Sequence, residues 1–147
     1  MSSIRILLVE DDTTDQELVK QELASKRHEV VFADTGESAL KALSSGSFDI
    51  VILDYHLPGI QGSELIHEIG KHFPALPVIV ITESKNPFLV RDAFRSGAAD
   101  YISKDQLHDK LATVIHEFES KSKINQENIA NLQVINEKLA GMKPFNI

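Results

Sequence analysis

Two runs of apolar residues that end in acidic residues constrain the fold of this chain more than any other feature. Ile6–Val9 is followed directly by the acids Glu10–Asp12, and Ile50–Leu53 is followed by Asp54. Each run has the length and the branched apolar composition of a strand that is buried on both faces. Ligands of open parallel α/β sheets bind outside the carboxyl ends of the strands. If the two strands are neighbours, their acids meet at one edge, where protons or a divalent cation must relieve the repulsion.

Segments with strand character alternate with segments with helix character along most of the chain. The expected strands are Ile4–Val9, Glu29–Ala33, Ile50–Leu53, Val78–Thr82 and Tyr101–Ile102. The expected helices, in which apolar residues recur three or four positions apart, are Thr14–Ser25, Glu37–Ser44, Ser63–His72 and Pro87–Ser96. Buried stripes are expected at Leu18, Val19 and Leu23 in the first helix and at Leu65, Ile66 and Ile69 in the third. The short connections predict right-handed βαβ units, and therefore an α/β fold with a doubly wound, five-stranded parallel sheet between two helical layers.

This alternating pattern ends at about Glu119, which predicts one domain over residues 1–119 and a helical extension over residues 120–147. The extension has no strand signal and is rich in Asn and Gln. Apolar residues near every seventh position run into it, at Leu111, Ile115, Phe118, Ile129, Leu132 and Leu139. Polar residues at Ser122, Asn125 and Asn136 interrupt this seam, so a coiled coil here would be weak. Three interpretations stay open: a helical linker to something absent from this chain, a helix that forms a homodimer, or a tail that folds back on the domain.

Composition excludes several classes of function. A formal net charge of -7 argues against nucleic acid as a direct partner, because phosphate binding needs clustered Lys and Arg. The absence of cysteine excludes disulfides, thiolate zinc sites and cysteine catalysis. No signal core follows Met1, and the apolar runs are far shorter than the roughly 18 residues of a membrane span. We therefore expect a cytoplasmic protein with no membrane contact.

Polar residues after the expected strands form an ordered set that matches a known family. The set comprises Glu10 and Asp11 after the first strand, Asp54 after the third, the segment Leu57–Gly62 beyond it, Thr82 after the fourth, and Tyr101 with Lys104 around the fifth. A pair of acids after a strand is weak evidence alone. Together with Asp54, Thr82 and Lys104 in this order and spacing, the stretch from Ile4 to Phe118 resembles the receiver domain of two-component response regulators.

The resemblance implies a fold, a reaction and a metal. The fold is flavodoxin-like with strand order 2-1-3-4-5, and Asp54 accepts a phosphoryl group from a phosphohistidine of a sensor histidine kinase or a histidine phosphotransfer protein. Mg²⁺ takes oxygen ligands and only one or two carboxylates. The direct ligands are expected to be Asp11 and Asp54, with Glu10 acting through water and the backbone carbonyl of His56 completing the set.

Three further residues receive roles by the same resemblance. Lys104 supplies a point charge for a phosphoryl oxygen, or for Asp54 before transfer. Thr82 donates its hydroxyl to another phosphoryl oxygen, and its movement gives Tyr101 room to rotate, which makes the pair a two-state switch. The chain is then a phosphoacceptor that assists its own Mg²⁺-dependent phosphorylation and dephosphorylation, rather than an enzyme.

Each of these residues also has an ordinary structural interpretation. Asp12 lies one position past the family's acidic pair, and we expect it to cap the following helix. Thr82 alone would be a strand-end threonine, Tyr101 a fixed core residue and Lys104 a solvated charge. The histidines are expected on solvated faces, apart from His56, whose ring lies near enough in sequence to Asp54 to overhang the site.

Two residues depart from the family pattern. Asp105 follows Lys104, where the family usually has proline, and a cis bond before a residue other than proline costs about 3 kcal/mol. Either this loop is trans or it is strained. Glu83 follows Thr82, where the family usually has a small residue. Its charge should slow phosphorylation by anionic small-molecule donors relative to a Glu83→Ala variant.

Rival functions share parts of this pattern. A flavodoxin-like binder would need a glycine-rich phosphate loop after the first strand, where three acids stand instead. A phosphatase with an aspartyl nucleophile would need a second acid two residues after Asp54, where His56 stands. An unphosphorylated docking module, and the N-terminal regulatory module of a larger effector or hybrid kinase, stay as alternatives within the same fold.

Overall fold

The computed structural model of the chain describes residues 4–24 and 28–120, and every strand and helix predicted before residue 120 is present there. The strands are β1 (Arg5–Val9), β2 (Glu29–Ala33), β3 (Ile50–Asp54), β4 (Val78–Thr82) and β5 (Asp100–Ser103). The helices are α1 (Thr13–Ala24), α2 (Gly36–Ser45), α3 (Gly62–His72), α4 (Pro87–Ser96), the 3₁₀ turn η1 (Lys104–Gln106) and an α-helix over residues 107–120. The ends of the predicted elements differ from the observed ends by one residue at most.

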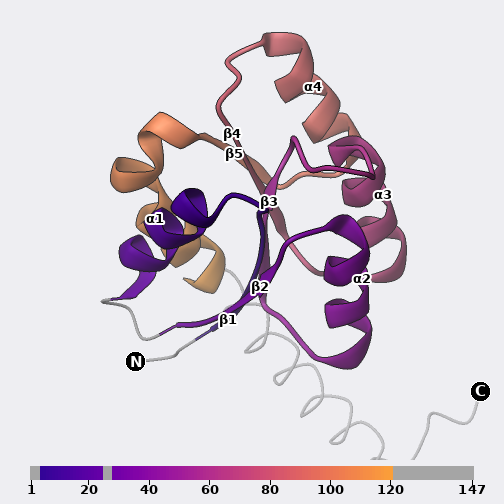
Figure 1. Cartoon of the computed structure of the whole chain (residues 1–147), viewed down its shortest axis with the longest axis horizontal. Coiled ribbons are helices and arrows are strands. Elements are labelled where there is room, and N and C mark those ends of the chain that lie inside the picture. Colours follow the sequence, from indigo (N-terminus) through magenta and orange to yellow (C-terminus); the bar gives the residue numbers. More distant parts are fainter. Residues whose placement is uncertain (1–3, 25–27, 121–147) are drawn as a thin grey trace, which may run out of the picture. The chain divides into compact units, whose positions relative to one another are not determined.

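All five strands form one parallel sheet in the order β2-β1-β3-β4-β5, which confirms the predicted fold (Figure 1). Every residue of β3 and β4 is buried, as expected for central strands covered on both faces. The edge strand β2 is buried only at Ala33.

The strand register brings the carboxyl ends of four strands to one level. Val9 pairs with Leu53, so the next residues of β1 and β3 are side by side. Asp54 pairs with Ile81, one residue before the end of β4, and Thr82 pairs with Ser103 at the end of β5. Polar side chains at the ends of separate strands are thereby gathered at one edge.

Helices cover both faces of the sheet. Figure 1 shows α2 and α3 on one side, and α1 with residues 107–115 on the other. Alternate strand residues such as Leu7, Val51 and Val80 pack in one core with Leu65 and Ile66 of α3. The opposite core is lined by the intervening strand residues and by buried residues of the other two helices: Ile6, Leu8, Ile52, Val19, Leu23, Leu111 and Ile115.

The predicted stripe of α1 was wrong at one position. Val19 and Leu23 are buried, but 45% of Leu18 is exposed. Residues four apart lie on one row of a helix, and a residue adjacent in sequence is turned away from that row. The predicted stripe of α3 is confirmed, since Leu65, Ile66 and Ile69 are all buried.

The structure divides into two compact units, Met1–Ile115 and His116–Ile147. The helix over residues 107–120 contributes Leu111 and Ile115 to the core of the first unit, so these two residues of the predicted seam already have a packing role. The rest of the predicted helical extension, residues 121–147, lies outside the described residues. The domain boundary at residue 119 and the homodimer therefore stay predictions.

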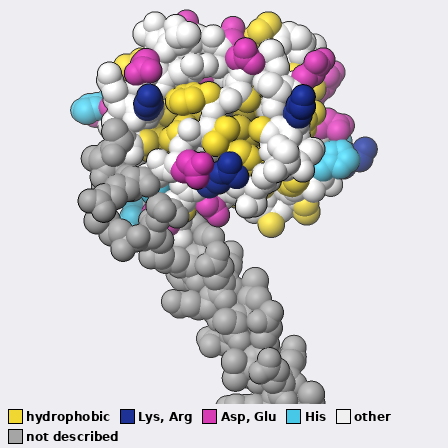
Figure 2. Space-filling model, turned by 60° about the horizontal axis from the view of Figure 1, so that its bottom comes forward, with side chains coloured by type: hydrophobic (Ala, Val, Ile, Leu, Met, Phe, Trp, Pro, Cys, Tyr) yellow, Lys and Arg dark blue, Asp and Glu magenta, His cyan; other side chains and the backbone are white. Residues whose placement is uncertain are grey.

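The surface of the described residues carries both hydrophobic and charged side chains. In Figure 2, hydrophobic side chains gather in the middle of one face, with acidic and basic side chains around them. The large hydrophobic residues that are exposed are Leu18, Phe32, Phe88 and Phe94. Within residues 4–24 and 28–120, no helix combines the length and the apolar character that crossing a bilayer requires.

Candidate functional site

Three carboxylates meet at the carboxyl edge of the sheet. Oxygens of Glu10, Asp11 and Asp54 lie within 4.8 Å of one another. Glu10 is completely buried and Asp54 is 5% exposed, whereas Asp11 is open to solvent. The backbone explains this arrangement, because Glu10 and Asp54 follow β1 and end β3 at the same level of the sheet.

Lys104 reaches these carboxylates from the turn after β5. Its Nζ donates hydrogen bonds to Oδ2 of Asp54 at 3.1 Å and to Oδ2 of Asp15 at 2.6 Å. The same Nζ lies 3.1 Å from Oε2 of Glu10. One ammonium group therefore faces three acids in a partly buried setting, where ion pairs are screened less than on the surface. We call Glu10, Asp11, Asp15, Asp54 and Lys104 the acidic rim.

The protonation of the acidic rim reflects its burial. Burial raises the pKa of Glu10 to about 7, and the nearby charge of Asp54 adds to this increase. The backbone N–H of Asp12 and the charge of Lys104 act in the opposite direction. Burial by itself would lower the pKa of Lys104, but its hydrogen bonds to Asp15 and Asp54 outweigh this and hold the pKa above its ordinary value.

One atom of the acidic rim lacks a hydrogen bond. Oε2 of Glu10 is buried and accepts none from the described residues. Nζ of Lys104 lies 3.1 Å from this oxygen, so an ion pair offsets part of the cost of its burial without forming a hydrogen bond. A buried carboxylate oxygen without a donor is costly. An oxygen-seeking cation or a water bound to it would satisfy this oxygen, so the residues present fit Mg²⁺.

The acidic rim opens to solvent through a small pocket of about 210 Å³. Besides the rim residues, Asp12, His56 and Glu83 line it. Asp12 caps α1 as predicted, since its Oδ1 accepts the backbone N–H of Asp15 at 3.0 Å. Glu83, which is exposed, adds a further acidic side chain to this lining.

Thr82 at the end of β4 and Tyr101 in β5 are linked through the loop that follows β4. Thr82 is completely buried, and its Oγ1 accepts the backbone N–H of Ser84 at 3.2 Å. The hydroxyl of Tyr101 donates to the carbonyl of the same Ser84 at 2.6 Å, and its half-buried ring packs against the core. The structure thus joins the two predicted switch residues through Ser84, and their switching role stays a prediction.

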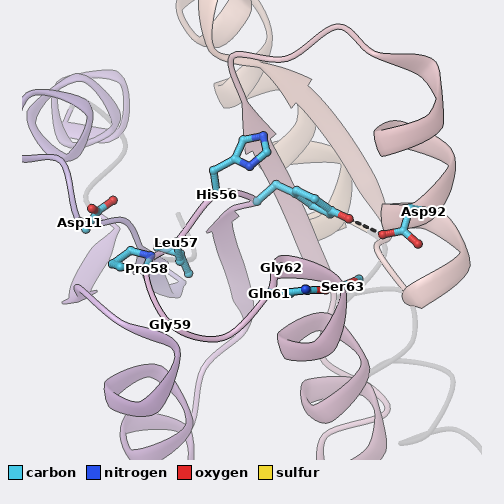
Figure 3. Close-up of a pocket in the computed structure, with 10 residues that line it drawn as sticks. Asp11, His56, Leu57, Pro58, Gly59, Gln61, Gly62, Ser63 and Asp92 are labelled. Atoms are coloured by element: carbon cyan, nitrogen blue, oxygen red, sulfur yellow. Dashed lines mark hydrogen bonds between the residues drawn. The ribbon is translucent and has the colours of Figure 1, made fainter.

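The loop after β3 forms a second, larger pocket of about 570 Å³ next to the first. His56 borders both pockets, and its backbone N–H donates to Oδ1 of Asp54 at 3.0 Å. The hydroxyl of Tyr55 donates to Oδ2 of Asp92 on α4, the bond that is dashed in Figure 3. Gly62 opens α3 against Tyr55, where a Cβ would lie 2.4 Å from the Tyr55 carbonyl oxygen. The residue after Asp54 therefore contacts both α3 and α4.

The loop that lacks proline is regular. None of the described peptide bonds is cis, so the bond between Lys104 and Asp105 is trans. Lys104 opens η1, and its carbonyl accepts the N–H of Leu107. Asp105 accepts the hydroxyl of Ser103 and lies 2.9 Å from Nζ of Lys85.

Sequence reasoning brought four of the five rim residues together and missed the fifth. Asp15 lies in the first turn of α1, where an acid is ordinarily explained by the helix dipole. A signal was available, because an acid one turn into the helix after the acidic run can point back over the same edge. The hydrogen bond from Tyr55 to Asp92 had no sequence signal.

Comparison with known proteins gives the same family from two directions. The response regulator receiver domain family matches residues 6–116. The response regulator protein FleR of Pseudomonas aeruginosa is 38% identical over 100 residues, which cover 68% of this chain and 21% of FleR. The sensor histidine kinase AruS of the same organism is 31% identical over 121 residues, which cover 80% of this chain and 12% of AruS.

A solved structure leads to the same family. A crystal structure of NtrX from Brucella abortus matches with a TM-score of 0.80 and 33% identity, over 89% of this chain and 30% of that one. The chain thus spans between about an eighth and about a third of the length of these three proteins.

Proposed function

The chain belongs to the response regulator receiver domain family, whose members act in phosphorelay signalling, and on this premise we propose that Asp54 is its phosphoacceptor. The observation that carries the proposal is the convergence of Asp54 with two further carboxylates and Lys104 at one open pocket. The phosphoryl donor would be a phosphohistidine of a sensor histidine kinase or a histidine phosphotransfer protein. Family membership also supports a cytoplasmic location.

Both oxygens of Asp54 are already oriented. Oδ1 accepts the backbone N–H of His56 and Oδ2 accepts from Lys104, so the carboxylate presents a fixed edge to the pocket. An ionised carboxylate needs no base to become a nucleophile. One of its oxygens forms a bond to phosphorus while the bond from phosphorus to the partner's imidazole nitrogen breaks, and the electron pair of that bond leaves with the imidazole.

The acidic rim would hold Mg²⁺ through Asp11 and Asp54, with Glu10 acting through water and the His56 carbonyl as a further ligand. When bound, Mg²⁺ supplies positive charge for the transferring phosphoryl oxygens. The buried oxygen of Glu10 that lacks a hydrogen bond supports this assignment.

Lys104 and Thr82 would receive the phosphoryl oxygens. Lys104 can move from Asp54 to a phosphoryl oxygen without leaving Asp15, because an ammonium group has three donors. The hydroxyl of Thr82 can donate while Oγ1 still accepts from Ser84. A shift of Thr82 would be passed through Ser84 to Tyr101, which is the proposed switch. The same groups are proposed to assist hydrolysis of the phosphoaspartate.

The test is modification by a small-molecule donor. Purified chain incubated with acetyl phosphate and Mg²⁺ should gain one phosphoryl group by intact mass, and Asp54→Asn should gain none. EDTA should prevent the gain in the unmodified chain. Equal labelling of the Asp54→Asn variant, or labelling that is insensitive to EDTA, would overturn the proposal.

The longer relatives suggest what the phosphorylated domain acts on. The matched segment lies within longer proteins that are named a response regulator and a sensor histidine kinase. We infer that this domain regulates an effector activity, either as part of a longer protein or by docking on a separate target.

A further inference from the structure

Asp105 joins the turn that carries Lys104 to the loop that follows Thr82. Its Oδ1 accepts the hydroxyl of Ser103, and its Oδ2 lies 2.9 Å from Nζ of Lys85. Ser103 ends β5 and is 5% exposed, whereas Lys85 lies in the loop between β4 and α4. One carboxylate therefore ties the residue before Lys104 to the loop that begins after Thr82.

We propose that Asp105 is a positioning residue, which holds the backbone of Lys104 so that its ammonium group faces Asp54. The proposal rests on the proposed function, because it concerns the phosphoryl transfer to Asp54. It assigns to the Asp105 carboxylate the rigidity that the expected proline would have given this loop.

The need for a tether follows from the short turn that presents Lys104. The turn η1 has three residues, and 3₁₀ turns have poorer hydrogen-bond geometry than an α-helix. The Lys104 side chain is long and flexible, and three acids compete for it. If the backbone of Lys104 shifts, its ammonium group changes its distances to Glu10, Asp15 and Asp54. A misplacement of about 1 Å is enough to slow a transfer step about a hundredfold.

The contact with Lys85 extends the tether to the second phosphoryl-binding group. Thr82 and Lys85 are separated by two residues, and Ser84 between them binds both Thr82 and Tyr101. Nζ of Lys85 lies 2.9 Å from Oδ2 of Asp105, so Asp105 contacts the loop that follows Thr82 as well as the residue before Lys104. Both Asp105 and Lys85 are more than half exposed, so their ion pair is weak by itself. The hydrogen bond from the buried Ser103 to Asp105 is the stronger of the two interactions.

Electrostatics alone predicts the opposite effect of removing Asp105. Its carboxylate is a negative charge one residue along the chain from Lys104, and an anionic donor should approach faster when this charge is removed. A positioning role predicts slower transfer. The sign of the change in rate therefore separates the two.

The experiment compares Asp105→Ala, Asp105→Asn and the control Asp109→Asn, which removes an exposed carboxylate from the following helix. The rate of Asp54 labelling is measured over a range of acetyl phosphate concentrations at saturating Mg²⁺. Mg²⁺ affinity is measured separately from the fluorescence of the two tyrosines, since the chain has no tryptophan.

We expect Asp105→Ala to lower the maximal labelling rate about tenfold, and Asp105→Asn, which can still accept from Ser103, about threefold. Mg²⁺ affinity should stay within about threefold, because Asp105 is an exposed and well screened charge. The control should label as fast as the unmodified chain or slightly faster.

Labelling of Asp105→Ala at or above the unmodified rate would overturn the inference. A parallel loss of rate and Mg²⁺ affinity would also overturn it, because that result means general damage to the acidic rim. If the unmodified chain is not labelled at all, the proposed function fails instead, so the two failures are distinguishable.

Discussion

The acidic rim and α4 are held in the structure by different means. All four buried polar residues among those described lie at the carboxyl edge of the sheet: Glu10, Asp54, Thr82 and Ser103. In α4, by contrast, only Ala93 is buried, and Phe88 is 75% exposed. The helix begins with local signals, an Asn86 cap and Pro87, rather than with a broad packed face.

The difference indicates a division of labour. Burial and cross-linking fix the groups that must be placed accurately for chemistry, whereas a lightly packed helix can shift at low cost. The hydrogen bond from Tyr55 to Asp92 joins the two regions, because it links the residue after Asp54 to α4.

The largest effect should come from removing the cation of the acidic rim. Lys104→Ala leaves buried carboxylates without their counter-charge, so at about pH 8 without Mg²⁺ we expect a loss of about 3 kcal/mol in the free energy of unfolding. Arg91→Ala on exposed α4 should change it by less than about 0.5 kcal/mol. Urea denaturation measures both. Similar small losses in the two variants would remove the contrast.

Substitution at the junction of the two regions should come next. A Cβ at Gly62 would lie 2.4 Å from the Tyr55 carbonyl oxygen, so Gly62→Ala should cost about 1–3 kcal/mol of unfolding free energy. Gly70→Ala on the same helix meets nothing within 4 Å and should stabilise by about 0.4–1 kcal/mol. Thermal and urea melts give both values. A neutral Gly62→Ala would mean that the junction is loosely packed.

The burial of Glu10 should make Mg²⁺ binding depend on pH. Its pKa of about 7 means that the metal must displace a proton below neutral pH, and that this competition fades above it. Affinity should therefore rise about tenfold between about pH 6 and pH 8, and Glu10→Gln should flatten this dependence. Mg²⁺ titrations at several pH values, followed by tyrosine fluorescence, measure this dependence. An equally steep dependence in Glu10→Gln would assign the proton to another group.

The smallest effect should come from removing the hydrogen bond between Tyr55 and Asp92. Tyr55→Phe removes the donor to Asp92 and should lower the free energy of unfolding by about 0.5–1.5 kcal/mol. The destabilisation should be greatest in α4. Hydrogen exchange should be faster for amides of α4 and unchanged for β3. A double-mutant cycle with Asp92→Ala checks the pair, since the second change should add little once the first is made. Unchanged exchange in α4 would show that other contacts hold this helix.

Much of the fold and most of the acidic rim could be predicted from the sequence because both depend on local patterns. Continuous apolar runs indicate central strands, and the acids after them reach one edge by sheet geometry alone, so Glu10, Asp11 and Asp54 were expected together. Lys104 required the family resemblance, since a lone lysine after a strand has no distinctive signal.

The remainder depends on side-chain directions across the fold. Leu18 and Val19 are adjacent and equally apolar, and only the packing of α1 decides which of them is buried. Asp15 binds Lys104, and Asp92 binds Tyr55. The partners in each pair are far apart in the sequence, so no local sequence pattern predicts these contacts. The same holds for the contact of Asp105 with Lys85.

A crystal structure of the chain with Mg²⁺ and beryllofluoride, which mimics a phosphoryl group, would show whether Asp54 is the phosphoacceptor. We expect beryllium bonded to a carboxylate oxygen of Asp54, Mg²⁺ bound by Asp11 and Asp54, and fluorine contacts from Lys104 and Thr82. Beryllofluoride at another residue, or a metal bound away from Asp54, would contradict the account.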